Sequence, residues 1–194
     1  MNASCERPSV EYPPSRYPAQ VPQPPSPLDF DPIDRAGALW EKHWPDQDPE
    51  VYASMRAVTS IMRAHQILIA DLDSMLRPFG ITFSRYEALV LLTHSRQGSL
   101  PLSVIGERLQ VHATSVTNVI DRLEGAGLVR RMPNPRDGRG TLAVITDAGR
   151  DVAAKATQAF NAANFGLSSL ELDDMRSVFT VLRRLRREVD DFVD

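Results

Sequence analysis

The stretch RRMPNPRDGRGTLAVIT, residues 130–146, decides the fold because it joins two strand-forming runs through a tip rich in proline and glycine. The runs are residues 128–132 and 141–146, and two prolines and two glycines lie between them. Proline and glycine interrupt strands and adopt turn conformations that other residues avoid, so the pattern predicts a β-hairpin. Turn formation does not require Arg136 and Arg139, and their presence at the tip indicates a binding role.

The segment before the hairpin, residues 113–127, has the period of an amphipathic helix. Its apolar stripe consists of Val116, Val119, Ile120 and Leu123. The opposite face and the residue before the helix supply the predicted DNA contacts, which are His112, Thr114, Ser115, Thr117, Asn118 and Arg122. Serine and threonine hydroxyls bind phosphates without bulk, asparagine pairs with adenine, and arginine binds guanine or phosphate. This face therefore fits a DNA major groove, although an ordinary solvated helix face has a similar composition.

A short helix is predicted at residues 101–109, just before the helix at residues 113–127. A short helix, a tight turn and a second helix with a polar face are typical of a helix-turn-helix. The hairpin that follows would then form a wing, with Arg136 and Arg139 entering the adjacent minor groove, whose negative potential attracts arginine. Asp137 is expected to fix the tip by pairing with Arg139 or by capping turn amides. The competing interpretation is a plain solvated hairpin.

The rest of the chain is predicted to be helical, so the fold class is mostly α with a small β-wing. Residues 1–32 hold nine of the fifteen prolines and are expected to form a disordered tail. Three further regions are predicted: an N-terminal extension helix at 33–46, a helical dimerisation region at 49–80 and 147–194, and a winged helix-turn-helix DNA-binding lobe at 81–146. The expected helix starts are marked by Asp31 with Pro32, by Ser84, by Thr146, and by a capping box of Ser168 and Glu171.

The last predicted helix carries an apolar seam whose members are spaced three and four residues apart. They are Met175, Val178, Leu182, Leu185, Val189 and Phe192. This spacing is that of a coiled coil, and its position beside an arginine cluster favours packing against a second copy over packing within one chain. A two-fold symmetric homodimer would place two recognition helices about one helical turn apart on a pseudopalindromic operator.

The composition is that of a globular protein without a membrane segment. No apolar run approaches the roughly 20 residues that span a bilayer, and no signal-peptide core is present, so the protein is expected to be cytoplasmic. The single cysteine, Cys5, excludes an internal disulfide. The net charge of −3 argues against indiscriminate coating of nucleic acid. Residues 108–150 nevertheless hold seven arginines against four acidic residues, as positioned phosphate contacts require.

Enzymatic and metal-dependent functions find no support in the sequence. It contains no glycine-rich phosphate loop and no nucleophile elbow. The four histidines lack paired ligand spacing, and no CxxC motif occurs. We therefore expect no catalytic activity, no metal and no cofactor. The alternative to a DNA-binding regulator is a protein-interaction adaptor that keeps the winged-helix fold without binding DNA.

The stretch LSVIGERLQVHATSVTNVIDRLEGAGLVRRMPNPRDGRGTLAVITDAG, residues 102–149, resembles the MarR family of dimeric winged-helix transcription regulators. The match includes the wing signature D-x-R at residues 137–139 and the pattern L-x-x-I-T-x-x-G at residues 142–149, and it extends over residues 49–193. The chain departs from the common Thr-Arg pair of the family, with Asn118 in the second position. The resemblance implies a homodimer formed by the N- and C-terminal helices, and a small-molecule pocket between that interface and the DNA-binding lobe.

The extension before residue 49 resembles that of the urate-responsive subgroup of this family, in which an added helix brings a tryptophan to the ligand. On this resemblance the effector-binding residues are Trp40, Trp44, His65 and Glu87, and the effector is an anionic or aromatic small molecule. Its binding would release a repressor from DNA by favouring a spacing of the two lobes that no longer fits the operator. The alternatives are that the tryptophans only hold the extension on the dimer and that His65 is an interior histidine.

Overall fold

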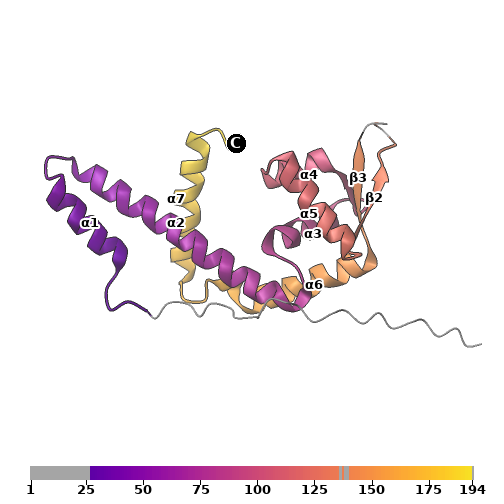
Figure 1. The fold of residues 1–194 in the computed structure, drawn as a ribbon, viewed down its shortest axis with the longest axis horizontal. Coiled ribbons are helices and arrows are strands. Elements are labelled where there is room, and N and C mark those ends of the chain that lie inside the picture. The colour runs from indigo at the N-terminus through magenta and orange to yellow at the C-terminus, as the bar shows by residue number, and fades with distance from the viewer. Residues whose placement is uncertain (1–26, 136, 138–139, 194) are drawn as a thin grey trace, which may run out of the picture. The chain divides into compact units, whose positions relative to one another are not determined.

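The computed structural model describes residues 27–135, 137 and 140–193, so the predicted tail lies almost wholly outside the described part (Figure 1). The chain divides into two compact units, Met1–Arg56 and Ala57–Asp194. The described elements are α1 (Pro32–His43), α2 (Pro49–Leu76), η1 (Arg77–Phe79), α3 (Phe83–His94), β1 (Ser99–Pro101), α4 (Leu102–Leu109), α5 (Ala113–Gly125), β2 (Val129–Pro133), β3 (Thr141–Ile145), α6 (Asp147–Ala162), η2 (Asn164–Gly166) and α7 (Leu172–Glu188). The predicted fold class, mostly α with a small β-wing, is confirmed.

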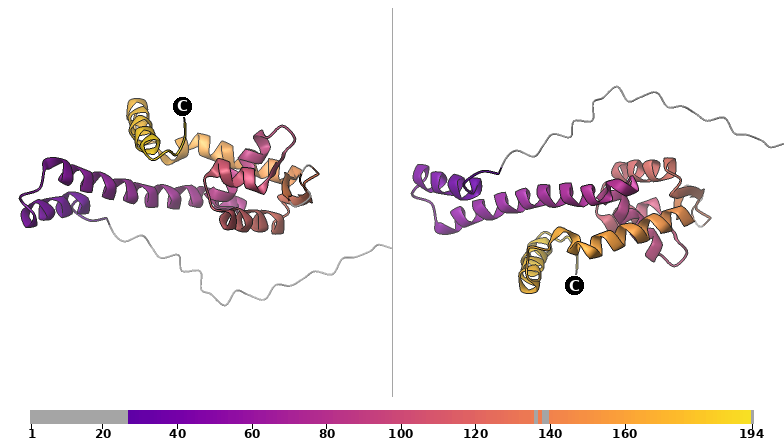
Figure 2. Two further views of the ribbon diagram at one scale, coloured as in Figure 1. Left: turned by 90° about the horizontal axis from the view of Figure 1, so that it is seen from above. Right: turned by 90° about the horizontal axis from the view of Figure 1, so that it is seen from below.

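In the first unit, α1 lies alongside the first turns of α2 (Figure 2). The carboxylate of Asp31 caps α1 by accepting the backbone N–H of Ile33 at 2.8 Å. The two helices are joined by an ion pair of 2.6 Å between Glu41 and Arg56. Gly37 permits this close approach, because a Cβ atom at that position would lie 2.3 Å from Nε of Arg56.

The small sheet has the strand order β1-β3-β2, and both pairings are antiparallel. The hairpin was predicted, and its register runs from Val129 opposite Ile145 to Pro133 opposite Thr141. The strand β1 was not predicted, because three residues are too few for a period-two pattern. It pairs Ser99 with Val144 and so attaches the segment before α4 to the base of the wing.

The hydrophobic core of the second unit lies between the sheet and helices α3, α4, α5 and α6. Its fully buried side chains include Leu89, Leu92, Ile105, Ile120, Leu123 and Phe160. The ring of Phe160 meets that of Tyr86 edge-on at a centroid distance of 4.8 Å, and the Tyr86 hydroxyl lies 3.0 Å from the Thr157 hydroxyl. Burial of each large apolar side chain contributes about 1.5–3 kcal/mol, so this core holds the recognition elements in place.

Two predicted helix starts are wrong. The N-cap of α3 is Thr82 and not Ser84, and the first helical N–H, that of Phe83, donates instead to the Asp73 carboxylate of α2 at 2.7 Å. A carboxylate brought in by tertiary packing thus replaces a local hydroxyl cap. The start of α7 is capped by Glu171 and Asp174 in a capping box, while the Ser168 hydroxyl donates to the carbonyl of Ala163 at 3.0 Å.

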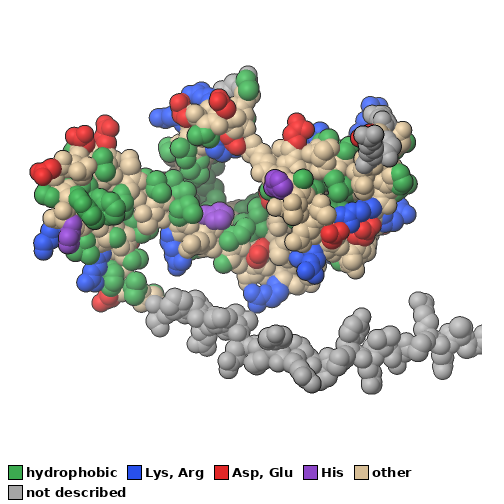
Figure 3. Space-filling view, turned by 45° about the horizontal axis from the view of Figure 1, so that its top comes forward, with side chains coloured by type: hydrophobic (Ala, Val, Ile, Leu, Met, Phe, Trp, Pro, Cys, Tyr) green, Lys and Arg blue, Asp and Glu red, His purple; other side chains and the backbone are tan. Residues whose placement is uncertain are grey.

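Helix α7 buries none of its residues, although its seam is strongly apolar. Val178, Leu185 and Val189 are 48%, 55% and 71% exposed. Helix α2 buries only Leu72 and Leu76, both near its C-terminal end. Hydrophobic side chains also gather at the surface of the N-terminal helices (Figure 3). The other three seam residues, Met175, Leu182 and Phe192, are half-buried. Within the described residues the seam is therefore not closed into a core of its own chain, and packing against a second copy stays a prediction.

Among the described residues, no helix combines the length and the apolar character that crossing a membrane requires.

Candidate nucleic-acid interface

Helix α5 divides into a buried and an exposed face, as predicted. Val116, Ile120 and Leu123 are buried, and Val119 is half-buried against the same core. The six residues predicted to contact DNA are all exposed: His112, Thr114, Ser115, Thr117, Asn118 and Arg122. Within the part of the chain that the structure describes, the side chains of Ser115, Asn118 and Arg122 form no hydrogen bond or ion pair. Their polar atoms are thus open to a ligand outside the chain.

The start of α5 is organised by His112. Its Nδ1 atom accepts the backbone N–H of Thr114 at 3.3 Å and lies 3.1 Å from the Thr114 hydroxyl. Its carbonyl accepts the N–H of Ser115 at 2.9 Å. The imidazole is therefore fixed over the N-terminus of a helix of 13 residues, where the helix dipole favours negative charge such as a phosphate.

The tip of the wing is held by backbone hydrogen bonds. The N–H of Asn134 donates to the Gly140 carbonyl at 2.9 Å, and the N–H of Gly140 donates to the Asp137 carbonyl at 2.8 Å. Asp137 is exposed. Arg136 and Arg139, the two arginines predicted to enter the minor groove, lie outside the described residues, as does Gly138.

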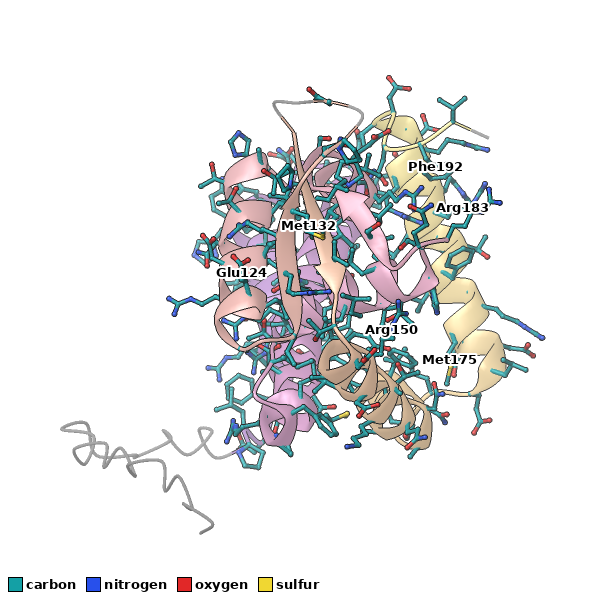
Figure 4. All side chains as sticks on the ribbon, turned by 90° about the vertical axis from the view of Figure 1, so that its right-hand side faces the viewer. Glu124, Met132, Arg150, Met175, Arg183 and Phe192 are labelled. Atoms are coloured by element: carbon teal, nitrogen blue, oxygen red, sulfur yellow. The ribbon has the colours of Figure 1, made fainter. Side chains whose placement is uncertain are left out.

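Arg131 joins the wing to α5, a role that the sequence reading missed. Its guanidinium binds the Asp121 carboxylate, lies 3.0 Å from the Glu124 carboxylate and donates to the Thr117 carbonyl at 3.3 Å. Its backbone N–H donates to the second oxygen of Glu124 at 2.9 Å. Figure 4 shows Glu124 on α5, beside the wing strands. Arg131 therefore fixes the angle between the two elements that would enter neighbouring grooves.

The electrostatic setting of Arg131 differs from that of its neighbour. Partial burial lowers the pKa of the Arg131 guanidinium, but hydrogen bonds to Asp121 and Glu124 outweigh this effect and raise the pKa above its ordinary value. Arg130 is exposed on the other face of the strand. One of the seven arginines counted in this region is thus neutralised by its own chain. Strand alternation from the buried Val129 places Arg131 toward α5, a signal that could have identified it.

The turn between α4 and α5 is connected to the segment after α7. Gln110 has left-handed backbone angles, with φ of 53°, and its side-chain amide donates to the carbonyl of Asp191 at 2.8 Å. The next residue, Phe192, lies beside Arg183 near the C-terminal end of α7 (Figure 4), with the guanidinium 4.8 Å from the ring centroid. This contact anchors the segment that reaches the helix-turn-helix.

The four candidate effector residues do not belong to one unit. Trp40 and Trp44 are in the first unit, exposed, with ring centroids 4.5 Å apart. His65 and Glu87 are in the second unit and also exposed, so the alternative of an interior histidine is wrong. Partial desolvation raises the pKa of Glu87 above its ordinary value. Among the described residues, no group of three or more histidine, cysteine or acidic side chains is arranged to hold a metal ion.

Comparisons with known proteins agree with this geometry. The profile of the MarR family matches residues 82–141. The crystal structure of Sco5413, a MarR family transcriptional regulator from Streptomyces coelicolor, is 53% identical with a TM-score of 0.68, and the match covers 73% of this chain and 99% of that one. Sco3205 from the same organism, solved in complex with DNA, is 26% identical with a TM-score of 0.63, covering 74% and 92% of the two chains.

The curated relatives match over a shorter part of their length. The HTH-type transcriptional regulator MhqR of Bacillus subtilis is 30% identical over 96 residues, which are 50% of this chain and 65% of the relative. The chain spans 65–67% of the first three curated relatives that it matches.

Proposed function

The chain belongs to the MarR family of transcriptional regulators, and from this premise we propose that it binds a specific DNA sequence through α5 and the wing. The observation that carries the proposal is the exposed polar face of α5, where Ser115, Asn118 and Arg122 lie opposite the buried stripe. Asn118 reads a base edge in the major groove, while His112, Thr114, Ser115, Thr117 and Arg122 position the helix on phosphates and bases. Arg136 and Arg139 enter the minor groove, with Asp137 in the tip between them.

The regulator acts as a homodimer on a pseudopalindromic operator. Exposed apolar side chains on both helices support this assembly. They include Val58, Ile61, Met62 and Ile67 of α2 and Val178 and Leu185 of α7. The two-fold axis then sets the distance between the two α5 helices at about one helical turn of DNA. A small-molecule effector that favours another distance would release a repressor, by a few kcal/mol at most. We propose no catalytic role.

The proposal is tested by selecting bound duplexes from a random DNA pool and measuring their affinity. Asn118→Ala should weaken the selected duplex by about 1–3 kcal/mol and leave random DNA almost unchanged, because it removes a base contact. The matched control is Asn161→Ala, on the exposed surface of α6. Equal weakening of both duplexes would reject base readout by Asn118.

The wing is tested separately with Arg139→Ala and the control Arg77→Ala, an exposed arginine of η1. The Arg139 variant should bind all DNA sequences more weakly. The slope of log K against log salt concentration should decrease in magnitude by about one. An unchanged affinity and slope would reject the wing assignment. If the full chain shows no salt-dependent DNA binding at all, the result would instead support the alternative of a protein-interaction adaptor that does not bind DNA.

The effector site proposed at Trp40, Trp44, His65 and Glu87 can be followed optically. The chain contains only two tryptophans, both in α1 or directly after it, so tryptophan fluorescence, excited selectively over that of the four tyrosines, reports on the extension alone. An anionic aromatic metabolite that releases DNA should change this fluorescence, and Trp44→Phe should remove most of the change. Release of DNA with constant fluorescence would place the effector site elsewhere.

A further inference from the structure

A pocket of about 550 Å³ lies between the loop after α3, the outer edge of β1, the end of α4 and the root of the wing. Its polar lining includes His94, Arg96, Gln97, Ser99, Arg108 and Asn134. None of these residues belongs to the polar face of α5 or to the four effector candidates. The lining of the pocket therefore shares no residue with the sets proposed above.

The fold brings two arginines to this pocket by different means. The N–H of Gly98, which has a positive φ of 64°, donates to the Ser95 carbonyl at 3.2 Å and closes a turn that places Arg96 at the surface. Arg108 belongs to the last turn of α4, next to the helix-turn-helix turn. Both arginines are exposed, and both line the pocket.

Among the described residues that line the pocket, the positive charge of the arginines is not balanced by an acidic side chain. None of the described residues that line it is Asp or Glu. Within the described ranges, neither Arg96 nor Arg108 forms an ion pair, whereas Arg131 contacts two carboxylates. Guanidinium groups bind phosphate through paired N–H donors, and amide and hydroxyl groups such as those of Gln97 and Ser99 can complete such a site.

Two lining residues of the pocket are close in sequence to the predicted DNA-binding elements. Arg108 precedes the helix cap His112 by four residues, and Asn134 begins the wing tip. A phosphate in the pocket would therefore lie between the turn before α5 and the wing.

We propose that this pocket is a phosphate-binding site in which Arg96 and Arg108 are the principal ligands. The phosphate comes either from the backbone of the bound duplex or from a free phosphorylated metabolite. The first source rests on the proposed DNA-binding function, and the second does not.

The first measurement uses inorganic phosphate and the full wild-type chain. Titration at constant ionic strength, with chloride as the reference anion, should shift the amide resonances of Arg96, Ser99 and Arg108 in a saturable way. The shifts should be absent in the double variant Arg96→Gln/Arg108→Gln. Because the wild-type titration needs no variant, a folding defect in the double variant does not prevent the test.

The second measurement compares salt dependence on the selected duplex. If a backbone phosphate occupies the pocket, Arg96→Gln and Arg108→Gln should each reduce the magnitude of the slope of log K against log salt concentration by about one. The control Arg77→Gln should leave this slope unchanged. If a free phosphate occupies it, the slopes stay equal and inorganic phosphate alters DNA affinity in the wild type only. Unchanged resonances together with unchanged slopes overturn the proposal. Failure of all DNA binding with intact phosphate shifts overturns only the proposed function.

Discussion

Helices α5 and α7 are both amphipathic, but the apolar face of α5 is buried and that of α7 is largely exposed. The stripe of α5 is closed by the core of its own unit, with Ile120 and Leu123 fully buried. The seam of α7 is open, with Leu185 more than half exposed. The stripe of α5 is thus covered within one chain, whereas the seam of α7 stays largely exposed there, and a second copy is the cover that we propose for it. An amphipathic period shows that a face is covered but does not show which chain covers it.

The largest effect is expected from Leu123→Ala. The side chain is fully buried, so its truncation leaves a cavity and should lower the free energy of unfolding by about 2–5 kcal/mol. Because the core lies within one chain, the loss should be the same at low and high protein concentration. Urea denaturation at two concentrations measures it, and a concentration-dependent loss would contradict the closed core.

The same truncation in α7, Leu185→Ala, should act on assembly. If each copy covers the other, dimerisation should weaken by roughly 2 kcal/mol, about thirtyfold in the dissociation constant. Sedimentation equilibrium measures this change, with Ala162→Gly at the exposed end of α6 as a control outside the seam. An unchanged dissociation constant would show that another element covers α7.

Arg131→Ala removes the side-chain contacts between the wing and α5 and leaves the buried core residues unchanged. Since the guanidinium and both carboxylates are partly exposed, the expected loss of unfolding free energy is only about 1 kcal/mol. Hydrogen exchange of the β2 and β3 amides should nevertheless increase, because the bonds to Asp121, Glu124 and Thr117 are lost. Arg130→Ala, on the opposite face of the same strand, is the matched control, and equal exchange in the two variants would argue against the clamp.

The smallest effect is expected at Glu87. Desolvation raises its pKa in the folded chain, so its contribution to stability is greatest at low pH and is lost as the pH rises through that pKa. Glu87→Gln should therefore raise the melting temperature slightly at pH 7 and leave it unchanged near pH 4. Thermal unfolding at the two pH values checks the sign. A uniform increase at both would point to a cause other than ionisation.

The elements with a clear period could be predicted from the sequence. The residues Val116, Ile120 and Leu123 define α5, and its opposite face is exposed as expected. The hairpin was predicted from turn chemistry, and the cap of α1 from Asp31 followed by Pro32. In these cases the information lies within a few residues of the element itself.

The features that could not be predicted depend on partners far away in the sequence. Thr82 replaces Ser84 at the start of α3 because Asp73 satisfies the first helical N–H. The Arg96 and Arg108 pocket requires the loop after α3, α4 and the wing to meet, which no local pattern encodes. Arg131 was counted with the basic residues, and only the contacts with α5 show that its charge is compensated internally.

The hydrogen bond between Gln110 and residue 191 means that the turn of the helix-turn-helix is held in part by the segment after α7. The acceptor is the main-chain carbonyl of Asp191, while its carboxylate lies 3.7 Å from the Arg186 guanidinium. Trimming the chain after residue 190 removes the acceptor together with the aromatic anchor Phe192. A shortened version would keep every predicted DNA-contacting residue and still lose the brace on the turn before α5.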